Sequence, residues 1–233
     1  MPTLEESLER VAAYYKAIAP IFHEGAGYSQ ARVNEAYEPL KAMYRSAFAK
    51  RDVLELACGS GFWSEVVVGV ANTLLSTDLH EEQVEITSKR LGHLSSFRCQ
   101  TANAYTLDTV EGSFSGAFGS YWWSHVPRKL QKSFLNTLHS RLRPGAQVMF
   151  SDNMPYYGET VKRRVDEHGD IYEERVERDD DFRFETIKNF PRENEFAELL
   201  DGIVDDLRYT ELSLPHIHKL STELWVVSYR LKQ

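Results

Sequence analysis

The chain has 233 residues, of which 27 are basic and 35 acidic, so its formal net charge is −8. Its length suits one large domain or one and a half, and neither a linker nor a repeat divides it. Duplex nucleic acids require a basic face, which this acidic chain lacks, so we expect a small-molecule partner and no nucleic acid. No apolar run approaches the ~20 residues of a membrane span, and the N-terminus lacks the pattern of a secretory signal. The two cysteines predict no disulfide framework, and we expect a cytoplasmic protein without membrane association.

The first 49 residues predict helices with little strand character. Apolar residues recur at helical spacing over residues 4–15 and again over residues 36–43. A glycine-containing segment, residues 23–28, separates the two predicted helices. This helical region precedes a sequence of strands and helices.

The segment Val-Leu-Glu-Leu-Ala-Cys-Gly-Ser-Gly, residues 53–61, predicts a buried strand that enters a glycine turn and opens a helix over 62–71. Gly59 and Gly61 lack Cβ atoms, so the backbone can turn sharply and expose its amides to a ligand. Asp78 follows Gly59 by 19 residues, near the end of the next strand-like run. A doubly wound sheet places a carboxylate at this position on the hydroxyls of a ribose.

Strands and helices then alternate. The expected strands are residues 73–77, 96–100, 114–120 and 147–150, and the expected helices are residues 81–91 and 128–142. Regular alternation predicts an α/β fold with a doubly wound, mostly parallel sheet and helices on both faces.

The pattern changes after residue 153. Residues 161–167, 171–178 and 182–188 alternate charged and apolar side chains, which predicts an added antiparallel β ribbon. A short helix over 193–200 and strands over 205–212 and 223–231 predict a terminal antiparallel hairpin at the sheet edge. We therefore expect one domain over residues 1–233, made of four segments. These are a helical lid (1–49), a cofactor-binding core (50–153), an inserted ribbon (154–190) and a C-terminal helix with a hairpin (191–233).

Residues 55–61 resemble the first motif of the class I S-adenosylmethionine-dependent methyltransferases. A dinucleotide-binding turn prefers a third glycine where this chain has Ser64, and it tends to lie near the start of the chain. The resemblance continues through Thr77-Asp78-Leu79, Asn103-Ala104, residues 114–118 and the turn at residues 142–146. It implies a seven-stranded sheet and S-adenosyl-L-methionine as the cofactor, with small-molecule members of the family as the best match.

The resemblance also implies which residues hold the cofactor. Gly59 and Gly61 would line the methionine end, with Glu55 and Ala57 beside them, although Glu55 could instead cap the loop backbone. Asn103 replaces the usual aspartate, and its amide oxygen could accept from the adenine amino group. Ser115 replaces the usual acid of the fourth strand. The full set of predicted cofactor contacts is Tyr15, Glu55, Ala57, Gly59, Gly61, Asp78, Leu79, Asn103, Ala104 and Ser120.

We assign catalytic roles to His125 and Tyr121, which follow the fourth strand. Methyl transfer needs a base only for a hydroxyl or a protonated amine, and histidine suits that near neutral pH. The alternative is that His125 caps the following helix. The predicted substrate contacts are Trp122, Trp123, Tyr156 and Tyr157; for the aromatic run after strand four, packing against the lid is the alternative.

The sequence predicts no metal site, because His23, His216 and His218 have no carboxylate or cysteine at a zinc-binding spacing. The charged ribbon is either a solvated face, a wall of the acceptor pocket or part of a homodimer interface. We predict an enzyme that transfers a methyl group from S-adenosylmethionine to an oxygen or nitrogen of a small molecule. An NAD-dependent oxidoreductase and a non-catalytic protein that binds a nucleoside ligand remain as alternatives.

Overall fold

The structure is a computed structural model that describes residues 3–155, 162–176, 183–215 and 223–233. The helices are α1 (Leu4–Ile18), α2 (Phe22–Gly25), α3 (Ala31–Ala36), α4 (Glu38–Phe48), α5 (Phe62–Val68), α6 (Glu81–Leu91), the 3-10 helix η1 (Trp123–His125), α7 (Arg128–His139) and α8 (Glu193–Leu200). The strands are β1 (Asp52–Leu56), β2 (Thr73–Asp78), β3 (Phe97–Thr101), β4 (Phe114–Ser120), β5 (Leu142–Asn153), β6 (Arg163–Val165), β7 (Ile171–Val176), β8 (Arg183–Ile187), β9 (Val204–Ser213) and β10 (Glu223–Leu231).

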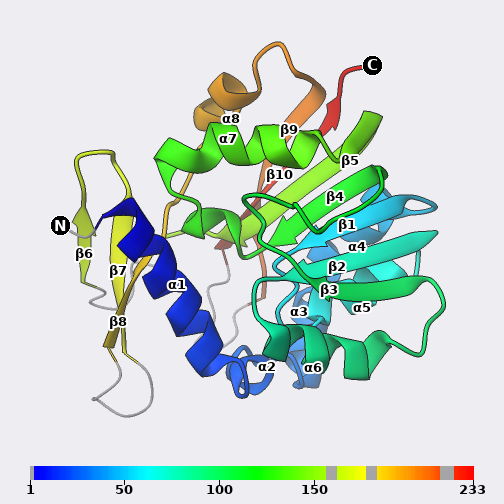
Figure 1. Cartoon of the computed structure of the whole chain (residues 1–233), viewed down its shortest axis with the longest axis horizontal. Helices are drawn as coiled ribbons and strands as arrows, with labels where there is room; N and C mark the ends of the chain where they lie inside the picture. Colours follow the sequence, from blue (N-terminus) through cyan, green and yellow to red (C-terminus); the bar gives the residue numbers. More distant parts are fainter. Residues whose placement is uncertain (1–2, 156–161, 177–182, 216–222) are drawn as a thin grey trace.

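The main sheet has seven strands in the order β3-β2-β1-β4-β5-β10-β9 (Figure 1). The first five strands in this order are parallel to one another, and β10 runs antiparallel to both β5 and β9. The order reverses at β1 and β4, so their carboxyl ends form the crevice in which such sheets bind ligands. The predicted doubly wound sheet and terminal hairpin are confirmed.

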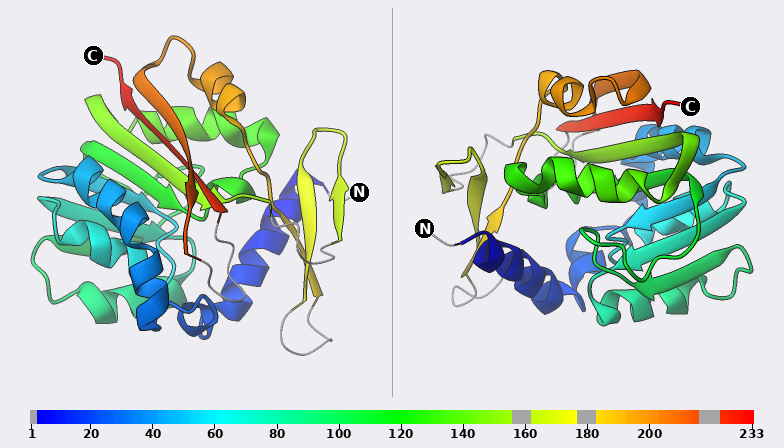
Figure 2. Two further views of the ribbon diagram at one scale, coloured as in Figure 1. Left: turned by 180° about the vertical axis from the view of Figure 1, so that it is seen from behind. Right: turned by 45° about the horizontal axis from the view of Figure 1, so that its top comes forward.

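Helices cover both faces of this sheet (Figure 2). Successive side chains of β1 point to opposite faces of the sheet. Leu54 and Leu56 pack in a core with α7 and α8. Val53 packs on the other face, in a second core with α3, α4 and α5. All three side chains are fully buried. Burial on both faces is the reason that β1 reads as a continuous apolar run apart from Glu55.

A second sheet, β6-β7-β8, is antiparallel and stands apart from the main sheet beside α1 (Figure 1). The hydroxyls of Ser7, on α1, and Tyr172, on β7, lie 3.0 Å apart in a buried hydrogen bond. The predicted antiparallel ribbon is therefore confirmed. It packs against the first helix, far away in the sequence.

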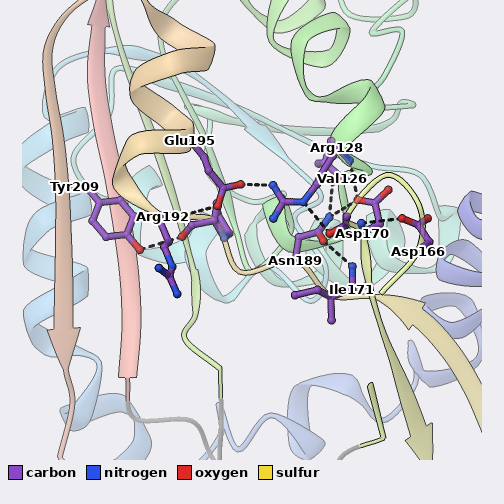
Figure 3. Close-up of polar contacts among 11 residues, drawn as sticks. Val126, Arg128, Asp166, Asp170, Ile171, Asn189, Arg192, Glu195 and Tyr209 are labelled. Atoms are coloured by element: carbon purple, nitrogen blue, oxygen red, sulfur yellow. Dashed lines mark hydrogen bonds and ion pairs between the residues drawn. The ribbon is translucent and has the colours of Figure 1, made fainter. Parts of the chain in front are cut away.

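A polar network fastens the ribbon to the segment after η1 (Figure 3). The side-chain amide of Asn189, fully buried, donates to Asp170 Oδ1 at 2.8 Å and to the Val126 carbonyl at 3.2 Å. Asp170 Oδ1 also accepts from the Arg128 backbone N–H at 2.8 Å, and the Arg128 guanidinium pairs with Glu195. Buried hydrogen bonds thus join the ribbon to the segment after η1, a partly buried one joins it to the start of α7, and the Arg128–Glu195 pair joins α7 to α8.

Several predicted boundaries are wrong. The lid contains four helices instead of two, since Pro39, at the start of α4, has no N–H for a continuous helix. The helix predicted to reach residue 142 ends at His139, and β5 begins at Leu142 because this residue pairs with Phe114 of β4. In the part of the chain that the structure describes, no helix is both long and apolar enough to cross a membrane, and both cysteines are free thiols.

Candidate functional site

The glycine turn after β1 has backbone angles that explain its glycines. Gly59 and Gly61 have φ values of +53° and +77°, which favour glycine. A Cβ on Gly61 would lie 2.8 Å from the side chain of Thr87 on α6, so close approach also requires glycine there. A Cβ on Gly59 would lie 3.5 Å from the ring of Phe22, which places the lid helix α2 directly over the turn.

The carboxylate of Asp78 fixes this turn. Its Oδ2 accepts from the Gly59 backbone N–H at 2.9 Å, and its Oδ1 accepts from the His80 N–H at 3.0 Å. Burial raises the pKa of Asp78 above its ordinary value, and the backbone donors partly oppose that shift. Each oxygen keeps a lone pair beyond these bonds, so the group can still accept from a ligand.

Glu55 lies beneath the turn, where it is 2% exposed. Its Oε2 accepts from the hydroxyl of Ser64 at 2.5 Å and from that of Ser76. The alternative of a cap on the loop backbone is not what the structure shows, because the partners found are hydroxyls. Burial raises the pKa of Glu55 to about 7, against hydrogen bonds that lower it. A carboxyl group that titrates near neutral pH is a marker of a functional site.

The next predicted cofactor residues extend the site along the strand ends. Leu79 is 48% exposed, although it is a large apolar residue. Asn103 Oδ1 accepts from the Tyr105 N–H at 2.9 Å, and the Ser120 hydroxyl lies 2.7 Å from the Tyr44 hydroxyl. At the strand ends, the apolar side chain of Leu79 thus lies on the same cavity wall as the polar side chains of Asn103 and Ser120.

His125 is held by two hydrogen bonds that define its tautomer. Its Nδ1 lies 2.6 Å from the Ile187 carbonyl, which can only accept, so Nδ1 carries the hydrogen. In the neutral ring, Nε2 is then the acceptor, and the Tyr15 hydroxyl donates to it at 2.7 Å. The alternative that His125 caps α7 is wrong, since Asp170 accepts the Arg128 N–H at that helix start.

The aromatic residues after β4 divide into cavity and core. The Tyr121 hydroxyl donates to the Tyr37 hydroxyl at 3.0 Å, and burial raises the pKa of Tyr121 well above its ordinary value. Trp122 lines the cavity described below. Trp123 is fully buried in the core against Phe134, Phe150 and Phe196, away from the cavity wall. Trp123 therefore packs in the core with α7 and α8, and not against the lid as the alternative had it.

These groups border one cavity of about 890 Å³, a size suited to a small-molecule site. It brings together most of the residues predicted from the sequence: Tyr15, Glu55, Ala57, Gly59, Asp78, Leu79, Asn103, Ala104, Ser120, Tyr121, Trp122 and His125. Gly61 and Trp123 do not line it. Tyr156, Tyr157, His216 and His218 lie outside the described residues.

The structure adds residues that the sequence did not single out. Arg163, Glu173, Lys188 and Phe190 come from the ribbon or directly after it. The available signal was weak: charged residues on short strands are usually solvated. No group of three potential metal ligands occurs among the residues that the structure describes, and His23 Nδ1 lies 2.9 Å from the Ser60 hydroxyl.

Comparison with known proteins agrees with this geometry. Residues 53–145 match the family model of a methyltransferase domain. The match covers 93 of the 233 residues and, together with the fold, supports a class I S-adenosylmethionine-dependent methyltransferase. A comparison with curated protein sequences finds no match.

The solved structures named below share the fold and are distant in sequence. DhpI, in complex with SAH, is 22% identical with a TM-score of 0.67, over 99% of both chains. An S-adenosylmethionine-dependent methyltransferase from Clostridium acetobutylicum is 16% identical with a TM-score of 0.62, over 94% of this chain and 99% of that one. The N-methyltransferase NodS from Bradyrhizobium japonicum, in complex with S-adenosyl-L-homocysteine, is 12% identical with a TM-score of 0.60, over 87% and 89%. These findings do not favour the NAD-dependent alternative.

Proposed function

We propose that the protein transfers a methyl group from S-adenosylmethionine to an oxygen or nitrogen of a small-molecule acceptor. The observation that carries the proposal is the continuity of the cavity. The glycine turn, Asp78 and His125 all line the same cavity. A cavity of about 890 Å³ suits the cofactor with a small acceptor better than a macromolecule.

The residues at the strand ends fit the cofactor. Asp78 can accept from the ribose hydroxyls, because both oxygens are fixed by backbone donors and retain lone pairs. The exposed side chain of Leu79 suits an adenine face, and Asn103 suits its polar edge. Glu55, beneath the glycine turn, suits the ammonium of the methionine moiety. We call this part of the wall the cofactor end.

The opposite part of the wall, which we call the acceptor end, consists of Tyr15, His125, Arg163, Glu173, Lys188 and Phe190. When bound, S-adenosylmethionine supplies an electrophilic methyl group on a sulfonium. The chain aligns the acceptor in line with that methyl group and excludes water. His125 Nε2 receives a proton from an acceptor hydroxyl or ammonium, and the Ile187 carbonyl holds the ring in the required tautomer. Tyr15 must then release Nε2, because its hydroxyl occupies that nitrogen in the structure.

The experiment has two parts. Calorimetric titration with S-adenosylhomocysteine tests the cofactor end, and incubation with labelled S-adenosylmethionine and panels of phenols, carboxylates and amines tests transfer. With an acceptor from this screen, we expect the pH–rate profile of the wild type to contain a titration step that vanishes in His125→Ala. An unchanged profile would remove His125 as the base, and absence of any binding would refute the cofactor site.

A further inference from the structure

Three charged residues of the ribbon stand on the wall of the acceptor end: Arg163 on β6, Glu173 on β7 and Lys188 directly after β8. All three lie outside residues 53–145, which match the methyltransferase domain. They therefore belong to the part of the molecule that the family model does not cover. The chemistry of these three side chains indicates which group of the acceptor they bind. This inference rests on the proposed function.

Lys188 is a buried cation that faces the cavity. Its side chain is 5% exposed, and its Nζ donates to Asp152 Oδ1 at 2.6 Å and to the Ser124 hydroxyl at 2.8 Å. An ammonium has three N–H donors, and no third partner for it is found among the described residues. One donor of a largely desolvated cation is thus left for a ligand.

The counterion of Lys188, Asp152, does not line the cavity. Asp152 is fully buried and accepts from the backbone N–H groups of Ser124 and Asn153. Burial, the largest single influence, would raise the pKa of Asp152, but the charge of Lys188, the charge of His125 and the hydrogen bonds from Lys188 and Ser124 together lower it. Since Lys188 lines the cavity and Asp152 does not, the cationic member of the pair is the one nearer to a bound acceptor.

The backbone around Lys188 is fixed on both sides. The Lys188 N–H donates to the Ile171 carbonyl at 2.7 Å, and the Asn189 N–H donates to the Ser124 carbonyl at 2.7 Å. The preceding carbonyl, of Ile187, accepts from His125. The buried amide of Asn189 ties the next residue into the network of Figure 3. Lys188 is therefore held beside His125 in one position, which is the property of a preorganised site.

Arg163 supplies a second cation. Its Nε donates to Glu173 Oε1 at 2.8 Å, and its guanidinium lies 5.3 Å from the centre of the Phe190 ring. Each of the two cations has one carboxylate partner, so the four groups are neutral in sum, but only the partner of Arg163 lines the cavity.

We propose that Lys188 and Arg163 form an oxyanion subsite that binds a carboxylate, phosphate or sulfonate group of the methyl acceptor. Hydrogen bonds between ionised partners are stronger than neutral ones, and a desolvated ammonium strengthens them further. A cationic acceptor would meet two positive groups and a carboxylate already paired with arginine. The subsite lies beside His125, so an anchored acid group places the remainder of the acceptor near the base.

The subsite is tested on the full chain loaded with S-adenosylhomocysteine. Sodium phosphate, sulfate and acetate are titrated calorimetrically at constant ionic strength, with sodium chloride and acetamide as references. We expect millimolar binding of at least one of the three anions by the wild type. Phosphate or sulfate in preference to acetate would assign a tetrahedral group, and the reverse preference a carboxylate.

Variants locate the binding. Arg163→Gln should weaken anion binding at least tenfold, whereas Arg164→Gln, the adjacent arginine that pairs with Glu185 away from the cavity wall, should not change it. Lys188→Gln combined with Asp152→Asn removes both charges of the buried pair and should also weaken binding tenfold or more. Retained affinity for S-adenosylhomocysteine shows that each variant is folded. Wild-type protein that binds S-adenosylhomocysteine but none of the anions, or variants that bind them as the wild type does, would overturn the subsite and leave the proposed function intact. Wild-type protein that binds no S-adenosylhomocysteine would refute the proposed function instead.

Discussion

The cofactor end and the acceptor end of the cavity take their walls from different parts of the chain. The cofactor end is made of short turns at the carboxyl ends of β1, β2 and β3, all inside the matched methyltransferase domain. The acceptor end takes only His125 from this domain and the rest from α1 and the ribbon, which are joined to each other. Under the proposed function, the turns at the strand ends bind the cofactor, and α1 and the ribbon bind the acceptor. Substitutions at the two ends should therefore separate cofactor binding from the chemistry of the acceptor.

The largest expected effect is at Asp78. Asp78→Ala removes the acceptor of the ribose hydroxyls and also frees the Gly59 N–H, so affinity for S-adenosylhomocysteine should fall at least tenfold. Hydrogen bonds to a charged group are worth about 1.5–3 kcal/mol each, so tenfold is a lower bound. Calorimetric titration measures the change, with the exposed Glu111→Ala as a control of equal charge change. Unchanged affinity in Asp78→Ala would remove this carboxylate from the site.

The next effect concerns Glu55 and pH. Its folded-state pKa of about 7 lies above its ordinary value, so the stability it contributes is complete below pH 4.5 and is lost as pH rises through 7. A shift of this size corresponds to about 3 kcal/mol. Glu55→Gln lacks this titration but keeps an acceptor for Ser64 and Ser76. Urea unfolding should show the variant gaining stability relative to the wild type, by up to about 3 kcal/mol, between pH 5 and pH 8. A difference that stays constant across this range would show that Glu55 is ionised throughout.

The smallest expected effect is that of Tyr15→Phe on cofactor affinity, and it decides to which end of the cavity Tyr15 belongs. The sequence predicts that Tyr15 contacts the cofactor, whereas in the structure its hydroxyl donates to His125. If Tyr15 serves the acceptor end, Tyr15→Phe should change affinity for S-adenosylhomocysteine by less than about twofold, or under 0.5 kcal/mol. Its effect should appear only in turnover with an acceptor. A tenfold loss of cofactor affinity would assign Tyr15 to the cofactor end instead.

The cofactor end could be predicted because its determinants are local. Gly59 and Gly61 are needed for backbone conformations that few other residues adopt, and Asp78 follows at the spacing of one βαβ unit. At the acceptor end, His125 was predicted, and a wall of the acceptor pocket was one alternative for the ribbon. The ribbon residues that form the wall were not predicted, because they are distant from His125 in sequence. Lys188 resembles any charged residue at the end of a strand until the fold places Asp152 next to it. Similarly, nothing local distinguishes Trp122, on the cavity wall, from Trp123, in the core.

The sequence by itself determined the alternation of strands and helices, the glycine turn with its carboxylate, and the presence of an antiparallel ribbon after β5. These follow from periodicity and from the steric freedom of glycine, which act over a few residues. Only the tertiary structure decided that the ribbon meets α1 and the η1 turn, because hydrogen bonds such as those of Asn189 and Tyr172 join residues far apart in the chain. The turn at residues 55–61 thus indicates the methyl donor, whereas the wall that faces the acceptor exists only once the chain is folded.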